Sequence, residues 1–456
     1  MPFVATPQQA EAMRMFADFM LDRDPHAVMI LRGSAGTGKT TLAGAVVKML
    51  VRMQQKVTLL APTGRAAKVF SLNSSHAAFT IHRKIYRQKS LLGKFSLNDN
   101  MHQDMLFLVD ECSMIANEGS PDSVFGSGYL LDDLVQYVYG GRNCRLGLIR
   151  DQAQLPPVGE ERSPALQADV LSAYGLKVFE YTLTEVLRQA QDSGILFNAN
   201  RIRTIAAGLL PKIRFNGFAD IQLVRGEELI DTLGSSYSEV GLDETMVVTR
   251  SNKRANIYNQ GIRNMVLGRD EELSSGDMLM IVKNNYYWEP DSPNLEGFGF
   301  IANGDRALVR RVRNSRDLYG FRFVDLLLQF PDYDNMELTA TVIIDSLHAE
   351  APSLTRDQRE QLFNAVMEDY ADVPQKAERI KKLKADPYYN ALQIKYAYAV
   401  TCHKAQGDQW AHVYIDQGYM TDDMLTPDYI HWLYTAFTRA TEKLFLVNWP
   451  EKQILR

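Results

Sequence analysis

Short apolar runs alternate with helical patterns over the first part of the chain. The predicted strands are residues 28–31, 57–61, 106–110, 146–149 and 178–183. Strands that alternate with helices are typical of a parallel sheet that is covered by helices on its faces. The sequence therefore predicts an α/β domain over residues 1–190.

A second series of the same kind begins after residue 190. A strand at 246–249 and a helix at 251–267 open it, and further strands follow at 396–400, 412–415 and 444–448. We expect a second α/β domain made of residues 191–284 and 391–456. The sequence between them, 285–390, contains short predicted strands at 306–313, 321–328 and 338–345, separated by turn signals, and then a polar helical stretch at 355–384. This predicts a small β-barrel with a helical extension.

A smaller insertion is expected within the first domain, at about 84–102. Polar and apolar residues alternate there around Gly93, which suggests a small hairpin that leaves the domain surface. The pattern alone fits an ordinary surface loop equally well.

Composition narrows the class of protein. The chain has 456 residues, of which 46% are hydrophobic and 23% charged, and no apolar run is long enough to cross a bilayer. The first residues lack the features of a signal peptide, and three cysteines are too few to suggest a disulfide framework, so we expect a cytoplasmic protein. The net charge of -5 argues against a uniformly basic surface, so any nucleic-acid site must be a local groove.

The most informative motif lies between the first predicted strand and the helix that follows it. Residues 33–41 read Gly-Ser-Ala-Gly-Thr-Gly-Lys-Thr-Thr, which is a complete phosphate-binding loop. Its glycines let backbone N–H groups point at phosphate oxygens, Lys39 neutralises phosphate charge, and Thr40 offers a hydroxyl to Mg²⁺. ATP and Mg²⁺ are therefore the expected ligands. The residues predicted to bind the nucleotide are Gly33, Gly36, Thr37, Gly38, Lys39, Thr40 and Thr41.

Two carboxylates end the apolar run at 105–109. In a P-loop fold this strand ends beside the phosphate loop, so Asp110 is expected to hold the magnesium shell and Glu111 to polarise the attacking water. Two acids at the exit of a buried strand can also be merely solvated, but the upstream phosphate loop favours catalysis.

The sequence Asp110-Glu111-Cys112-Ser113 resembles motif II of superfamily 1 helicases, in the branch typified by RecD and the phage Dda helicase. The remaining motifs of that family follow in order along nearly the whole chain. Segments similar to the Q motif, motifs Ia, Ib and III, the arginine-bearing segment, the opening of the second motor domain, and motifs V and VI stand at 6–9, 61–67, 80–83, 151–158, 183–189, 247–253, 401–407 and 434–440.

The resemblance implies a fold and a set of roles. The fold is two RecA-like P-loop motor domains with parallel sheets, a hairpin insertion called a pin, and an SH3-like barrel insertion. Gln9 would read the adenine edge and Gln154 would sense the γ-phosphate. Arg188 and Arg439 would approach the departing phosphate from opposite sides of the cleft, where arginine stabilises the charge that spreads over the phosphate oxygens.

The resemblance also implies a nucleic-acid surface. The residues expected to contact single-stranded DNA are Thr63, Arg65, His82, Thr401, His403 and Lys404. Phe95, in the hairpin, is a candidate wedge that stacks on the last base pair of a duplex junction. The alternative is an aromatic side chain packed beneath its own hairpin.

The implied activity is ATP-dependent unwinding of DNA with 5′-to-3′ movement by a protein that acts as a monomer. Two alternatives remain: an RNA-directed helicase of the same motor type, and an ATP-binding clamp that hydrolyses ATP weakly. The second alternative rests on Arg150, which stands where the family usually has glycine before the aspartate of motif III.

Overall fold

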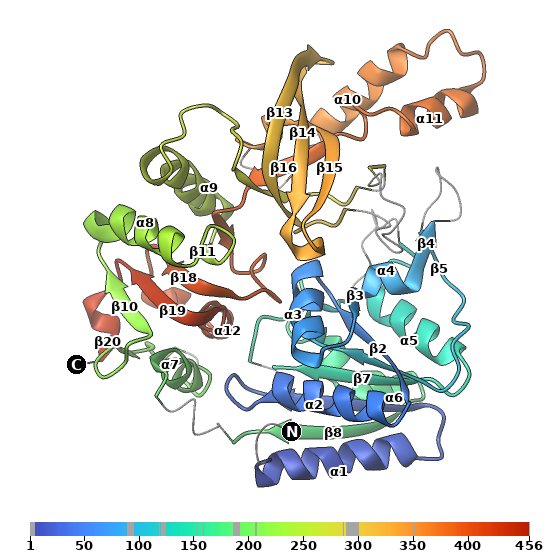
Figure 1. Ribbon diagram of the computed structural model, residues 1–456, viewed down its shortest axis with the longest axis vertical. Coiled ribbons are helices and arrows are strands. Elements are labelled where there is room, and N and C mark those ends of the chain that lie inside the picture. The colour runs from blue at the N-terminus through green and yellow to red at the C-terminus, as the bar shows by residue number, and fades with distance from the viewer. Residues whose placement is uncertain are drawn as a thin grey trace.

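The computed structural model describes residues 5–88, 95–117, 119, 125–151, 153–157, 159–185, 192–205, 208–285, 287–288, 301–349, 351 and 353–455. Three units are visible in Figure 1: an α/β domain that contains the N-terminal third, a second α/β domain beside it, and a barrel above the junction of the two. None of the described helices combines the length and the apolar character that crossing a bilayer requires.

The first α/β domain is built on a parallel six-stranded sheet in the order β3-β2-β6-β7-β1-β8. Its apolar strands are buried because helices cover both faces. The strands are β1 (Ala27–Gly33), β2 (Lys56–Ala61), β3 (Ala78–Thr80), β6 (Met105–Val109), β7 (Arg145–Arg150) and β8 (Lys177–Leu183). The helices are α1 (Pro7–Leu21), α2 (Lys39–Arg52), α3 (Gly64–Ser74), α4 (Ile81–Ile85), α5 (Leu130–Gly140) and α6 (Ala168–Ala173).

The second α/β domain has a parallel five-stranded sheet in the order β10-β19-β18-β11-β17. Its strands are β10 (Ile221–Val224), β11 (Thr245–Thr249), β17 (Ala399–Thr401), β18 (Trp410–Asp416) and β19 (Ala440–Val447). Its helices are α7 (Gly194–Ile202), α8 (Leu229–Glu239), α9 (Asn252–Gly261) and α12 (Pro427–Phe437). Strands β9 (Ile213–Arg214) and β20 (Ile454–Leu455) form a separate short pair.

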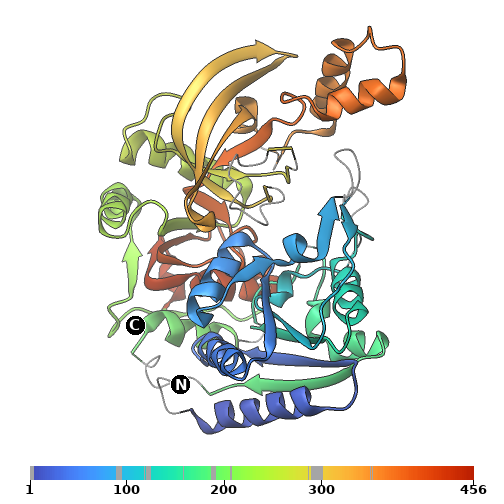
Figure 2. The same cartoon turned by 45° about the vertical axis from the view of Figure 1, so that its right-hand side comes forward.

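The insertion is a closed five-stranded barrel, β12 to β16. Its strands are β12 (Met278–Ile281), β13 (Arg306–Leu318), β14 (Phe321–Phe330), β15 (Met336–Ile343) and β16 (Leu392–Tyr396), and helices α10 (Arg356–Glu368) and α11 (Lys376–Lys384) lie between the last two strands. The helical pair projects to one side of the barrel (Figure 2). The expected barrel with a helical extension is therefore present.

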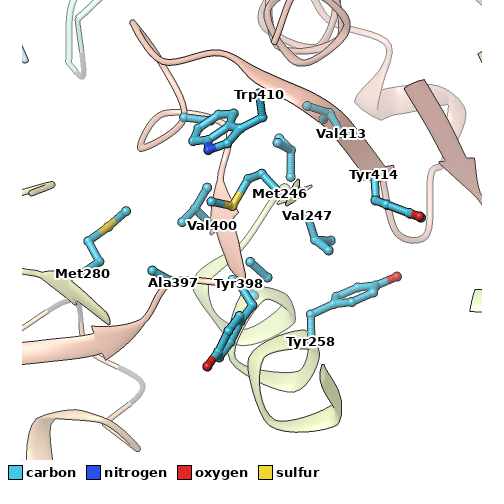
Figure 3. Close-up of a cluster of buried hydrophobic side chains, with 14 of the residues drawn as sticks. Met246, Val247, Tyr258, Met280, Ala397, Tyr398, Val400, Trp410, Val413 and Tyr414 are labelled. Carbon is cyan, nitrogen blue, oxygen red and sulfur yellow. The ribbon is translucent and has the colours of Figure 1, made fainter. Parts of the chain in front are cut away.

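The barrel includes residues on both sides of the expected range of 285–390. Strands β12 and β16 lie outside that range, yet both are needed to close the barrel. The expected strand at 396–400 is also divided: Tyr396 ends a barrel strand, whereas Ala399 begins a strand of the second motor sheet. One buried core spans this boundary: Met280 of the barrel, Met246 of the motor sheet and Tyr398 lie in the same cluster (Figure 3). Continuous burial is why apolar pattern alone places no boundary here.

The predicted hairpin is formed by β4 (Tyr86–Gln88) and β5 (Phe95–Leu97), which pair antiparallel. Its base lies on α4 and α5, at the edge of the first motor domain (Figure 1). Residues 89–94, which contain the expected tip, lie outside the described residues.

Candidate active site

The phosphate loop connects β1 to α2 and depends on glycine at two kinds of position. Gly36 and Gly38 have φ angles of 79° and 77°, in the left-handed region that glycine adopts without strain. At Gly33, an added Cβ atom would lie 2.7 Å from the Thr37 hydroxyl oxygen. These features fit a backbone cradle at a helix N-terminus, which is a favourable site for phosphate.

Lys39 begins α2 and its ammonium group lies over the loop. Its Nζ donates to the carbonyl oxygen of Ser34 at 2.8 Å and lies 3.7 Å from Oδ2 of Asp151. The hydroxyl of Tyr434, from α12 in the second motor domain, accepts a hydrogen bond from the Ala35 N–H at 2.8 Å and donates one to the Asp151 carboxylate. The loop is thus tied to motif III and to the second domain through a single hydroxyl group.

Asp110 and Glu111 follow β6 directly. Desolvation by the surrounding protein raises the pKa of Asp110 to about 7, and the negative charge of Glu111 adds to this effect. Glu111 has a φ angle of 52°, and its N–H donates to Oδ1 of Asp110 at 2.9 Å. A left-handed conformation at a residue other than glycine costs energy and is typical of functional sites.

These groups line a cleft of about 440 Å³ between the two motor domains. The first domain contributes Ser34, Ala35, Gly36, Gly38, Lys39, Thr40, Thr41, Asp110, Glu111, Arg150, Asp151 and Gln154; the second contributes Ser193, Ile195, Leu196, Gln409, Thr438, Ala440 and Thr441. The cleft brings a hydroxyl, a carboxylate and a lysine beside the glycine cradle. This donor set fits a nucleoside triphosphate with Mg²⁺, which Thr40 and Asp110 would hold.

Gln154 and Arg150 lie in the first-domain wall of the cleft. The Oε1 atom of Gln154 is buried and has no hydrogen-bond partner among the described residues. The Arg150 side chain is also buried, and its Nη1 lies 3.5 Å from Oε2 of Glu111. Burial lowers the pKa of the Arg150 guanidinium, while the charge of Glu111 opposes that shift.

Three other predicted nucleotide contacts have different settings. Gln9 is buried and its Nε2 donates to the Thr37 carbonyl oxygen at 3.4 Å, so it supports the base of the loop. Arg439 is fully buried within the second domain, where it donates to the carbonyl oxygens of Thr435 and Asp408 and to the Thr438 hydroxyl. The described cleft lining does not include Arg439. Arg188 lies outside the described residues.

The motif Ia residues lie where the first domain meets the rest of the molecule. Thr63 caps α3 and donates to Oδ1 of Asp408 at 3.3 Å. Arg65, expected to contact nucleic acid, is buried instead: it donates to the Gln409 carbonyl oxygen and to Glu244, and lies 5.1 Å from the Trp410 ring centroid. Its guanidinium group forms contacts between the domains, and the sequence of motif Ia does not reveal these partners.

His82 and Phe95 belong to one aromatic cluster. The His82 ring lies 4.7 Å from that of Phe125, and burial lowers its pKa to about 4, so it is neutral at pH 7. Phe95 is only 6% exposed and its ring lies 5.1 Å from Phe125. This setting favours the packing alternative for Phe95, and the wedge role stays a prediction.

The motif V residues are more accessible. Thr401 and Lys404 are half-buried and His403 is exposed at the end of β17. Burial, together with the charge of nearby Lys404, lowers the pKa of Lys395 to about 8. Two lysine side chains, one from the barrel and one from the second motor domain, thus place like charges close together.

Several interdomain contacts were not assigned from the sequence, although they lie within its motifs. On α12, Thr435 Oγ1 accepts from the Leu155 N–H at 2.8 Å, and His431 Nδ1 lies 2.9 Å from the Ala153 carbonyl oxygen. Gln406 of motif V donates to the Leu155 carbonyl oxygen. The sequence motifs indicate that these segments are functional. Which of their side chains contact motif III depends on how the two domains are arranged.

Comparison with known families agrees with this architecture. Residues 4–208 match a model described as an AAA domain, and residues 396–447 match a model described as the UvrD-like helicase C-terminal domain. The chain is therefore an ATP-hydrolysing motor with two RecA-like domains. Together with the motif order, these matches agree with the predicted resemblance to superfamily 1 helicases of the RecD type.

Similar proteins come from distant sources. The ATP-dependent RecD2 DNA helicase of Deinococcus radiodurans is 25% identical over 92% of this chain and 47% of its own length. An uncharacterised protein of Acanthamoeba polyphaga mimivirus is 22% identical, covering 96% of this chain and 98% of that protein. An uncharacterised protein of Methanocaldococcus jannaschii is 23% identical, and the match covers 97% of this chain and 38% of that protein.

Solved structures of Pif1 helicases also align with the whole chain. The crystal structure of Pif1 helicase from Bacteroides in complex with ADP-AlF3 and single-stranded DNA has 14% identity and a TM-score of 0.47, with 100% of this chain and 95% of that chain covered. The structure of two Pif1 helicases at forked double-stranded DNA has 16% identity and a TM-score of 0.48, with the same coverage. The fold assignment rests on the two sheets and the barrel, not on these scores.

Proposed function

We propose that the chain unwinds DNA by moving 5′-to-3′ along a single strand while it hydrolyses ATP. The observation that carries this proposal is the cleft itself, whose two walls come from different motor domains. Nucleotide binding at such a site is coupled to domain movement, because a ligand that contacts both walls favours the closed arrangement of the two domains.

The cleft residues have separable roles in this proposal. Lys39 neutralises phosphate charge, Glu111 accepts a hydrogen bond from the attacking water, and Gln154, which lines the same cleft, senses the γ-phosphate. Bound ATP with Mg²⁺ supplies the phosphoryl group whose transfer to water provides the free energy for movement. Thr40 and Asp110 are the residues that would hold the metal.

In this proposal, motif III couples movement of the second domain to the nucleotide cleft. The Leu155 peptide is gripped by Thr435 and Gln406 of the second domain, and the same loop contains the cleft residues Asp151 and Gln154. A displacement of the second domain relative to the first therefore displaces residues that face the nucleotide. This contiguous set of contacts supports coupling between the two sites.

The lysine pair at the junction of barrel and second domain supports phosphate binding. Lys395 is buried and donates to the Ala349 carbonyl oxygen, so the half-buried Lys404 is the cation of this pair that we propose contacts phosphate. Contact with phosphates carries no base information, so we expect little sequence preference. Thr63, His82, Thr401 and His403 remain proposed contacts of the same strand.

Unwinding assays on tailed duplexes test the proposal directly. Wild-type protein and Lys39→Ala are mixed with ATP, Mg²⁺ and a duplex that bears either a 5′ or a 3′ single-stranded DNA tail. We expect strand separation only by the wild type and only with the 5′ tail. Preferential use of the 3′ tail would overturn the direction, and unwinding of RNA-tailed substrates alone would favour an RNA-directed motor.

A further inference from the structure

Arg150 ends β7 in the wall of the nucleotide cleft, where the resembling motif usually has glycine. Its side chain is among the largest that are fully buried. Nε donates to the Asp151 carbonyl oxygen at 2.6 Å and Nη2 donates to the Leu155 carbonyl oxygen at 3.2 Å. Two backbone carbonyl groups of the motif III loop therefore fix the guanidinium plane.

The third nitrogen of the guanidinium forms no hydrogen bond within the part of the chain that the structure describes. Nη1 is buried without an acceptor among the described residues, and Oε2 of Glu111 is buried without a donor; the two atoms lie 3.5 Å apart. Leaving a buried donor and a buried acceptor unsatisfied is costly, so their proximity calls for a physical reason. A small shift of either side chain would convert this ion pair into a hydrogen bond or separate it.

We propose that Arg150 is a positioning residue that restrains Glu111 and places this restraint under the control of the second motor domain. The inference rests on the proposed function, in which Glu111 orients the attacking water. An arginine beside the carboxylate competes with water for its lone pairs and lowers its strength as an acceptor.

Control by the second domain follows from the shared peptide at Leu155. Its carbonyl oxygen accepts from both Arg150 and Gln406, and its N–H donates to Thr435. When the second domain moves, it carries this peptide, and Arg150 moves relative to Glu111. DNA binding that repositions the second domain thus changes how tightly Glu111 is restrained.

Replacing the charge tests the restraint. Arg150→Gln retains a polar side chain but loses the cation, so we expect the kcat for ATP hydrolysis without DNA to rise about tenfold, equivalent to about 1.4 kcal/mol in activation free energy. The KM for ATP and the kcat with saturating single-stranded DNA should change little, which reduces the stimulation ratio. Arg150→Lys retains a cation near Glu111 and should keep the rate without DNA low.

Arg145 provides a matched control at the other end of the same strand. It is also a buried arginine bonded to backbone carbonyl groups, those of Phe19 and Asp22, but it is not part of the described cleft lining. Arg145→Gln should lower thermal stability without changing the stimulation ratio.

The possible outcomes separate this inference from the function on which it rests. An unchanged stimulation ratio in Arg150→Gln, or an equal rise in Arg150→Lys and Arg150→Gln, would overturn the restraint while leaving the motor function intact. Wild-type protein that hydrolyses no ATP with or without DNA would overturn the proposed function itself.

Discussion

The nucleotide cleft and the β4–β5 hairpin use their side chains in opposite ways. In the cleft, charged and polar groups come from two domains, and Glu111, Arg150 and Gln154 each have a buried polar atom that forms no hydrogen bond with the described residues. At the hairpin, Tyr86 and Phe95 fill an aromatic core with Phe125. The difference indicates that the cleft keeps bonding capacity for a ligand, whereas the base of the hairpin is built for rigidity.

The largest effect should come from the cleft. Lys39→Ala should lower the kcat for ATP hydrolysis by about a thousandfold or more, because it removes the positive charge that lies over the phosphate loop. Circular dichroism should show an unchanged fold. Lys48→Ala, at an exposed position on the same helix, is the control and should retain wild-type turnover. Near-normal turnover in Lys39→Ala would contradict the site.

At the hairpin, the main effect should be on stability. Phe95→Ala creates a cavity beside Phe125 and should reduce the free energy of unfolding of the first motor domain by about 3–5 kcal/mol. Chemical denaturation measures this. Arg87→Ala, on the neighbouring strand, removes only an exposed ion pair to Asp99 and should have almost no effect. Loss of unwinding with unchanged stability would return Phe95 to the role of wedge.

Arg439 combines features of both regions. The sequence predicts that it acts in the cleft, but its side chain is buried in the second domain. Its three hydrogen bonds lie inside the second domain, so Arg439→Ala should destabilise that domain by about 2–4 kcal/mol. Lys443→Ala on the same chain segment removes an exposed ion pair with Glu239 and serves as the control. A fall in kcat without any loss of stability would show that the guanidinium acts at the phosphate.

Tyr434→Phe should have a smaller effect, confined to the cleft. The variant removes the hydroxyl that joins the Ala35 N–H to Asp151, and we expect kcat/KM for ATP to fall about tenfold. Tyr429→Phe removes another buried hydroxyl from the same helix, bonded to Gln417 and Gln453. Equal effects of both variants on kcat/KM would argue that helix stability, not the loop contact, matters.

The smallest change is expected at the lysine pair. Lys404→Ala should reduce the steepness of the salt dependence of single-stranded DNA binding by about 0.7 in log–log slope, the contribution of one phosphate contact. Fluorescence anisotropy over a range of salt concentrations measures this slope. Lys177→Ala, which disrupts an ion pair with Asp22 at the far end of β8, should leave it unchanged. An unaltered slope in Lys404→Ala would place the strand elsewhere.

Sequence reasoning worked best where a motif determines its own local geometry. The glycine pattern around Lys39 and the acids at the end of β6 require only a strand, a turn and a helix, and the two α/β domains and the barrel were likewise predicted from periodicity and resemblance. The family matches agree with the predicted ATP-dependent helicase motor.

Residues whose surroundings come from distant segments could not be placed in this way. Arg65 is paired with Glu244 and Gln409, and Phe95 packs against Phe125, so tertiary contacts far along the chain decide their settings. The barrel boundary was missed because Tyr396 and Ala399 belong to one apolar run but to two sheets. A pattern of polar and apolar positions gives burial, but it does not identify the partner.

The central claim is that the cleft hydrolyses ATP under the control of a nucleic-acid strand bound across the two motor domains. Steady-state ATP hydrolysis by the wild-type protein, measured while single-stranded DNA is titrated from zero to saturation, tests this claim most directly. We predict a saturable rise in kcat that is absent in Lys39→Ala. Turnover that does not change with DNA at any concentration would contradict the account.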